Sequence, residues 1–107
     1  MSKMQRDKGK RGEYKAIKDF SSIFPKAERH LEFQASEADL GVDLKNTGNL
    51  SIQVKNYKKY VNPSMIDQVK DKGIPVLVTY SDRKKGIACL YVEDLVKILK
   101  DVGEAYK

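Results

Sequence analysis

Three polar residues have the types and the spacing that a hard metal cation and a phosphate group require. Asp43 lies between two apolar residues, and Gln53 and Lys55 flank Val54 in a second apolar run. Side chains two residues apart in a strand project to the same face, so Gln53 and Lys55 point the same way. If the two runs pair through the turn at 46–49, a carboxylate, an amide oxygen and an ammonium group converge.

Such a group suits the hydrolysis of a phosphodiester, which needs a cation to neutralise phosphate charge and to activate a water. Asp43 offers an anionic oxygen, while Gln53 and the backbone carbonyl of Val54 offer neutral ones, and Mg²⁺ or Mn²⁺ prefers such ligands. Lys55 can orient or help to deprotonate the water, or stabilise the phosphoryl charge. The alternative is a surface ion pair, because Asp and Lys are common on exposed sheet faces.

Glu13 adds a second carboxylate to the candidate site. It precedes Ala16, Ile17 and Phe20 by helical spacings, so it lies on the apolar face of a helix predicted at 12–24. An acid on that face is costly unless it is paired or binds a metal. The alternative is that Glu13, in the first turn, complements the helix dipole, and both roles are compatible.

The elements that must position these residues follow from hydrophobic periodicity and turn signals. Asn62 is a suitable N-cap, Pro63 suits the first helical position, and Gly73 suits the end of that helix. The predicted helices cover residues 12–24, 63–73 and 93–102, and the predicted strands cover 29–35, 42–44, 50–56, 76–80 and 87–92.

This order predicts an α/β fold with a mixed five-stranded sheet flanked by helices. The first three strands have short connections and favour an antiparallel meander. The crossover through the helix at 63–73 should place strands 50–56 and 76–80 parallel. In the last helix, the apolar face should turn inward, and it consists of Leu95, Val96, Leu99 and Val102.

The bulk properties limit the classes of protein. A length of 107 residues predicts one domain near the lower size limit, and we therefore expect a homodimer. We expect residues 1–8 to form a flexible basic arm and residues 9–107 to form the domain. No apolar run approaches the length of a membrane span, and the charged start predicts no secretory signal. One cysteine and one histidine exclude a Cys/His metal cluster and favour a reducing, cytoplasmic compartment.

The chain is basic, with 21 Lys and Arg against 15 acids. The excess gathers near the N-terminus, after the strand at 50–56 and in the turn before residue 87. A clustered excess indicates a polyphosphate partner such as a nucleic acid, and the alternative is an ordinary solvated surface. The candidate phosphate-binding cations are Lys8, Lys10, Arg11, Lys58, Lys59, Arg83 and Lys84.

The ordered segments Gly12-Glu13, Gly41-Val42-Asp43 and Gln53-Val54-Lys55 resemble the PD-(D/E)XK nuclease superfamily, and most of all the small Holliday junction resolvases of archaea and phages. The similarity spans about residues 8 to 92. It implies a restriction-endonuclease-like core and an intracellular enzyme of bacterial, archaeal or phage origin. That enzyme would bind Mg²⁺ and cleave four-way DNA junctions in recombination and repair.

Carried over residue by residue, the resemblance makes Glu13 and Asp43 metal ligands and Lys55 the catalytic lysine. Gln53 takes the second acidic position, which removes one negative charge from the catalytic group. The resemblance also places Ser36 near the scissile phosphate, although a plain loop serine is the alternative. Two other functions stay open: a nicking or repair-type nuclease on duplex, flap or single-stranded DNA, and a catalytically inactive DNA-binding module.

Overall fold

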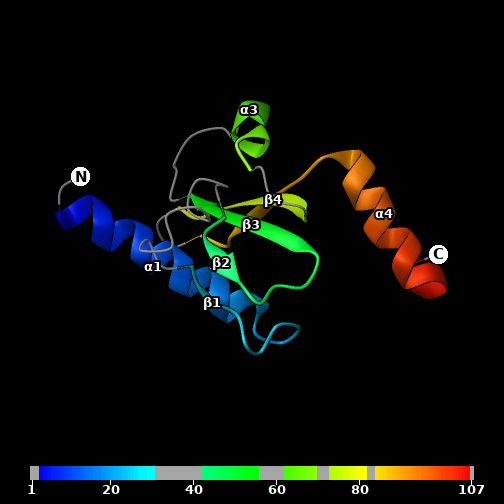
Figure 1. Ribbon diagram of the computed structural model, residues 1–107, viewed down its shortest axis with the longest axis horizontal. Coiled ribbons are helices and arrows are strands. Elements are labelled where there is room, and N and C mark those ends of the chain that lie inside the picture. The colour runs from blue at the N-terminus through cyan, green and yellow to red at the C-terminus, as the bar shows by residue number, and fades with distance from the viewer. Residues whose placement is uncertain (1–2, 31–41, 56–61, 70–72, 82–83, 107) are drawn as a thin grey trace.

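The computed structural model describes residues 3–30, 42–55, 62–69, 73–81 and 84–106. It has a mixed α/β fold, with a three-stranded mixed sheet, a two-stranded sheet and surrounding helices. Helix α1 (Lys3–Phe20) lies along one side of the strands, α3 (Pro63–Asp67) lies on the opposite side, and α4 (Val92–Val102) extends away from them (Figure 1). Within these ranges no helix is long and apolar enough to span a bilayer.

Helix α1 (Lys3–Phe20) begins well before the predicted start at Gly12. Most of the segment that we expected as a flexible arm is therefore helical, and its Lys, Arg, Gln and Met residues are good helix formers. The helix ends at Phe20, where the hydroxyl of Ser21 donates to the carbonyl of Lys18 at 2.7 Å. This bond offers the backbone an alternative to further helix, so the end comes before Phe24.

The three-stranded sheet consists of β3 (Leu50–Lys55), β4 (Ile74–Thr79) and β5 (Ile87–Cys89). Strands β3 and β4 are parallel, as the sequence predicts, and β5 is antiparallel to β4. In the sequence, α3 (Pro63–Asp67) comes between β3 and β4. The side chain of its N-cap Asn62 accepts a hydrogen bond from the N–H of Ser64, which confirms the predicted cap. The helix ends at Asp67, before Gly73.

The prediction of one five-stranded sheet is wrong, because β1 (Glu28–Arg29) and β2 (Leu44–Lys45) form a separate antiparallel pair. The N–H of Asp43 donates to the carbonyl of Ile52 at 2.9 Å. The next N–H along β3, that of Val54, donates instead to the Asp43 side chain. A side chain thus replaces a backbone carbonyl, and no regular ladder joins β2 to β3. The predicted strand at 29–35 lies outside the described residues from position 31.

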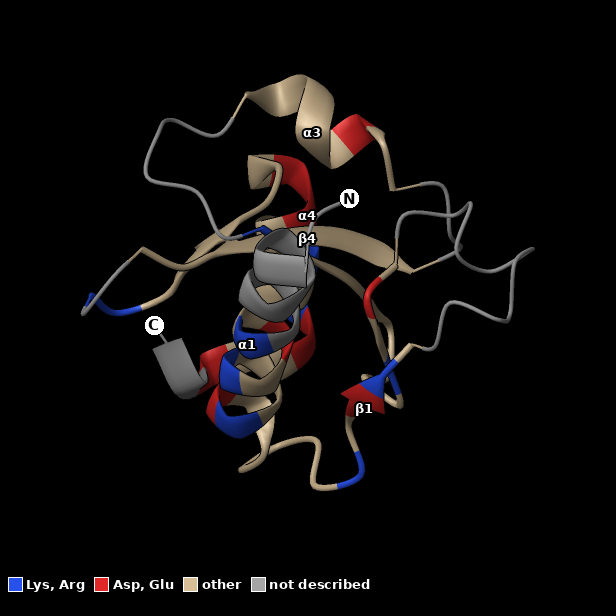
Figure 2. Cartoon of the chain, turned by 90° about the vertical axis from the view of Figure 1, so that its left-hand side faces the viewer, with Lys and Arg blue, Asp and Glu red and all other residues tan. Residues whose placement is uncertain are grey.

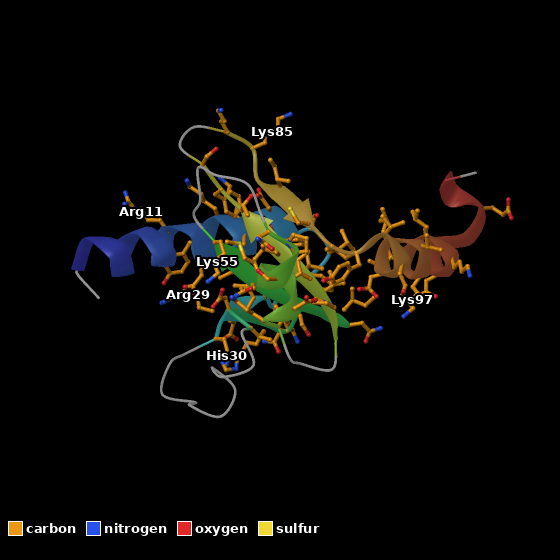
Figure 3. All side chains as sticks on the ribbon, turned by 90° about the horizontal axis from the view of Figure 1, so that it is seen from above. Arg11, Arg29, His30, Lys55, Lys85 and Lys97 are labelled. Atoms are coloured by element: carbon orange, nitrogen blue, oxygen red, sulfur yellow. The ribbon has the colours of Figure 1, made fainter. Side chains whose placement is uncertain are left out.

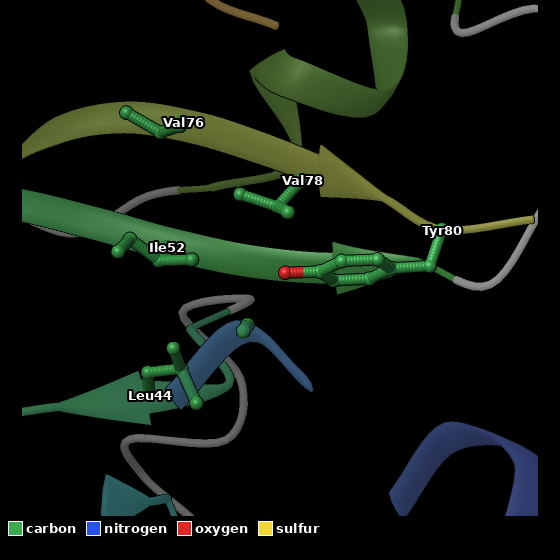
Figure 4. Close-up of a cluster of buried hydrophobic side chains, with 6 residues drawn as sticks. Leu44, Ile52, Val76, Val78 and Tyr80 are labelled. Atoms are coloured by element: carbon green, nitrogen blue, oxygen red, sulfur yellow. The ribbon is translucent and has the colours of Figure 1, made fainter. Parts of the chain in front are cut away.

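The core joins α1 and β2 to β3 and β4 (Figure 4). Strand β3 is buried on both faces, since Ile52 and its neighbours Ser51 and Gln53 are all buried. Ala16 packs into this core, and it therefore holds the preceding turn of α1, which carries Glu13, close to β3. The cluster consists of Ala16, Leu44, Ile52, Val76, Val78 and Tyr80.

Helix α4 (Val92–Val102) continues into a short 3-10 turn, η1 (Gly103–Tyr106). The prediction that its apolar face turns inward is wrong. The hydroxyl of Tyr91 donates to Asp67, which holds the start of α4 beside α3, and the helix extends outward from there (Figure 1). Its exposed apolar side chains are Val92, Leu95, Val96, Leu99 and Val102.

Candidate metal centre

Three hydrogen bonds fix Asp43, two of them to β3 and one to His30. Its carboxylate accepts from the N–H of Val54 at 2.7 Å, its N–H donates to Ile52 at 2.9 Å, and its carbonyl accepts from the N–H of His30 at 2.8 Å. The N–H and the carbonyl of one strand residue point to the same edge. The Val54 carbonyl, a predicted ligand, therefore faces the edge of β3 on which Asp43 lies.

Burial raises the pKa of Asp43 to about 6, although the hydrogen bond from Val54 opposes this shift. The negative charge of Glu13 also raises this pKa, whereas the positive charges of Lys55 and His30 lower it. These effects require proximity, since charges in a protein act over short distances. The charges of Glu13 and Lys55 thus lie within electrostatic range of Asp43, and these are three of the four predicted catalytic residues.

Gln53 is the fourth, and its side chain is buried on the β3 face that it shares with Lys55. Its Oε1 atom has no hydrogen-bond partner within the described part of the chain. A buried amide oxygen without a partner costs about 1–3 kcal/mol. Such an atom suggests a ligand that satisfies it, and a cation is one ligand that a carbonyl-type oxygen can bind.

Glu13 lies near the middle of α1, so the first-turn dipole interpretation is wrong. Its Oε2 accepts from Nε of Arg29 at 2.7 Å, and both side chains are largely buried. This bond raises the pKa of Arg29, and the Arg29 guanidinium also lies 5.6 Å from the centre of the Tyr14 ring. Glu13 is therefore paired, as an acid on a buried face must be.

The donor set suits a hard cation better than zinc. The described residues contain no group of three or more His, Cys, Asp or Glu side chains that could hold a metal. The candidate ligands are two carboxylates, one amide oxygen and one backbone carbonyl, which are all oxygen donors. Mg²⁺ and Mn²⁺ accept such a set, and Mg²⁺ commonly binds few carboxylates and keeps several waters.

The predicted nucleic-acid contacts are described only in part. Arg11 and Lys84 are exposed, and Lys8 and Lys10 belong to α1. Figure 3 shows Arg11, Arg29 and Lys55 toward one end of the molecule, and Lys97 on α4 at the other. Lys, Arg, Asp and Glu alternate on α1, so its described surface carries both signs of charge (Figure 2). Four predicted contacts lie outside the described residues: Ser36, Lys58, Lys59 and Arg83.

Two residues near Asp43 were missed from the sequence, Arg29 and His30. Arg29 lies at the end of β1 and is sixteen residues from its partner Glu13, on a different element. No local spacing connects these two residues. The sequence signal for this pairing is the predicted burial of Glu13, because a buried carboxylate is unfavourable without a cationic partner.

Comparison of the chain with protein-family models, curated proteins and solved structures finds no match. The case for a function therefore rests on the chemistry around Asp43. That chemistry combines a partly buried carboxylate of raised pKa, an amide oxygen without a partner in the described part of the chain, a second carboxylate and an ammonium group.

Proposed function

We propose that the chain is a Mg²⁺- or Mn²⁺-dependent endonuclease that cleaves DNA, with four-way junctions as its preferred substrate. One observation carries this proposal: the carboxylate of Asp43 is partly buried beside strand β3, and that strand also carries the Gln53 oxygen, which is buried without a partner among the described residues. Both groups gain from a bound cation. The preference for junctions comes from the sequence resemblance alone.

The cation would be held by Glu13, Asp43, Gln53 and the Val54 carbonyl. A divalent cation at this position supplies charge neutralisation at the phosphate and a water of lowered pKa. Lys55, whose positive charge already acts on Asp43, orients the attacking water, takes its proton or stabilises the phosphoryl oxygens. Arg11 and Lys84 contact the DNA backbone, and these contacts position the substrate.

The order of elements supports a restriction-endonuclease-like core. A helix carries the first acid, the segment before β2 carries Asp43, β3 carries Gln53 and Lys55, and a helix then leads to the parallel strand β4. This is the order in which the sequence resemblance places the same motifs. The separate β1–β2 pair departs from the continuous sheet that we expected.

A second copy of the chain is the proposed partner at α4. Val92, Leu95, Val96 and Leu99 follow the spacing of one helix face, and all four are exposed. A contiguous apolar surface of this kind marks an interaction site. A two-fold dimer would present two catalytic sites to opposing strands of a junction.

The rival function is a DNA-binding module without catalysis. Two observations favour it: Gln53 is neutral where the resemblance calls for an acid, and Glu13 is already bonded to Arg29. Both reduce the negative charge that attracts a divalent cation. In that case DNA would bind with a strong salt dependence, while no metal would bind at millimolar concentrations.

The test is Mg²⁺-dependent cleavage of a synthetic four-way junction by the wild type, Asp43→Asn and Lys97→Gln. Asp43→Asn should lower cleavage by more than about a hundredfold. Even mutation of a residue that only hydrogen-bonds to a metal ligand lowers metal affinity or activity about 10- to 100-fold. Lys97 is exposed on α4, and its replacement should leave cleavage unchanged. Equal cleavage by the wild type and Asp43→Asn would contradict the site. Parallel duplex and flap substrates separate a junction enzyme from a nicking or repair-type nuclease.

A further inference from the structure

Arg29 is already bonded to Glu13, one of the carboxylates that the proposed function assigns to a metal cation. Its Nε donates to Oε2 of Glu13 at 2.7 Å, with 25% of the Arg29 side chain and 16% of the Glu13 side chain exposed. The guanidinium also lies 5.6 Å from the centre of the Tyr14 ring, within the range of a cation–π interaction. Two contacts therefore hold this cation at the edge of the site.

The carboxylates of the described site have cationic neighbours without a metal. Glu13 is bonded to Arg29, and the positive charges of Lys55 and His30 act on Asp43. A divalent cation that binds Glu13 must therefore compete with a guanidinium that is already hydrogen-bonded. Breaking a partly buried ion pair costs free energy unless the released charge finds a new partner.

We propose that Arg29 is an internal counter-cation. A divalent cation displaces its guanidinium from Glu13, and the guanidinium then binds a phosphodiester of the DNA. A guanidinium binds carboxylates and phosphates through the same planar set of N–H donors. DNA therefore removes the competitor of the metal, and the metal releases a cation for the DNA. The two ligands bind with positive coupling, which must be reciprocal. This inference rests on the proposed function, because it assumes the metal centre at Glu13 and Asp43.

The experiment measures Mn²⁺ binding to the full chain by electron paramagnetic resonance. Each protein is titrated with Mn²⁺, once without DNA and once with a four-way junction that carries phosphorothioate linkages across its crossover. In the wild type, the junction should raise Mn²⁺ affinity by about fivefold or more, the usual lower bound of such coupling. Arg29→Gln should bind Mn²⁺ more tightly than the wild type without DNA and should lose most of the enhancement. Arg29→Lys, which keeps the charge but not the donor geometry, should lie between them.

The outcomes separate the two proposals. If Arg29→Gln binds Mn²⁺ as the wild type does, with the same response to DNA, Arg29 is not a competitor, and the metal centre stands. If Arg29→Gln binds Mn²⁺ more weakly, Arg29 only positions Glu13, and the inference is again wrong. If the wild type and Asp43→Asn bind Mn²⁺ equally, the metal centre itself is wrong, and the inference fails with it.

A second variant covers the case in which Arg29→Gln does not fold. Glu13→Gln weakens the partner of Arg29 and frees the guanidinium for phosphate, so junction affinity without metal should increase. Asp43→Asn removes one negative charge from the same site without releasing Arg29, and it is the matched control. An increase in Glu13→Gln that is at least about threefold larger than in Asp43→Asn supports the inference. An equal increase overturns it.

Discussion

The carboxylate of Asp43 accepts a hydrogen bond from the backbone N–H of Val54 at 2.7 Å, where a neighbouring strand would supply a carbonyl. The same side chain thus interrupts the β ladder and forms the centre of the candidate site. This arrangement couples the protonation of Asp43 to folding, because the group is held in place by β3 and shielded from water by the fold.

Asp43 should make the stability of the metal-free protein depend on pH. Its pKa rises from an ordinary value of 3.8 to about 6 in the folded chain, mainly because of burial. A raised acid pKa means that the folded state binds the proton more tightly. Its stabilising contribution is therefore complete below about pH 4 and is lost as the pH rises through 6, a total of roughly 2–3 kcal/mol.

Asp43→Asn should remove this pH dependence, because an amide stays neutral and still accepts from Val54. With a chelator present, the variant should match the wild type near pH 4 and exceed it by about 2–3 kcal/mol at pH 8. Urea unfolding at both values of pH measures the difference. If the two proteins keep a constant gap from pH 4 to 8, the carboxylate does not titrate in this range.

Gln53→Glu should have opposite effects with and without metal. Without metal, the new carboxylate is buried and should lower the unfolding free energy by about 1–3 kcal/mol. With Mg²⁺, the added charge should tighten binding by at least about tenfold. Thermal unfolding with and without Mg²⁺ tests both signs, and Gln53→Met, which has no oxygen ligand, is the control. A Gln53→Glu variant that Mg²⁺ does not stabilise further than the wild type would argue against a cation there.

Gly73 allows β4 to begin close to β3. A Cβ atom at this position would lie 2.7 Å from the carbonyl oxygen of Asn49 and would overlap the Ser51 hydroxyl. The same carbonyl accepts from the N–H of Ile74 at 2.7 Å, so the backbone cannot simply move away. Gly73→Ala should cost about 1–3 kcal/mol, the usual range for overpacking.

Adding Ser51→Ala to Gly73→Ala tests the origin of that cost. Removal of the hydroxyl should recover only part of the loss, because the Asn49 carbonyl remains in place. Full recovery in the double variant would show that the Ser51 side chain alone opposes the Cβ. Chemical denaturation of the two single variants and the double variant gives the coupling between the positions.

The sequence was most informative where local chemistry decides the structure. The alternation of residues 50–55 and the cap formed by Asn62 predicted β3 and the start of α3. The helical spacing of Glu13 predicted an acid that faces the sheet, and the structure brings it near Asp43. Periodicity reports which face of an element is apolar, and these elements bury that face against the same chain.

Tertiary contacts decided what the sequence could not show. The predicted continuous sheet does not form, because the N–H of Val54 donates to the Asp43 side chain rather than to a backbone carbonyl. The pairing of Arg29 with Glu13 joins residues on separate elements, and no spacing rule links them. The apolar stripe of α4 was identified correctly, but a stripe does not specify whether the same chain or another covers it.

The apolar face of α4 should mediate self-association. Between 40% and 45% of Leu95, Val96, Leu99 and Val102 is exposed, which is high for residues on one helix face. Leu95→Glu places a charge in this face and should weaken the dimer by more than tenfold, since burying an unpaired charge costs several kcal/mol. Asp101→Asn on the opposite face changes the charge by one unit and should leave association unchanged. Light scattering during gel filtration measures the mass of each protein. A wild type that stays monomeric at high concentration excludes a second copy as the partner, and dimeric Leu95→Glu would place the interface elsewhere.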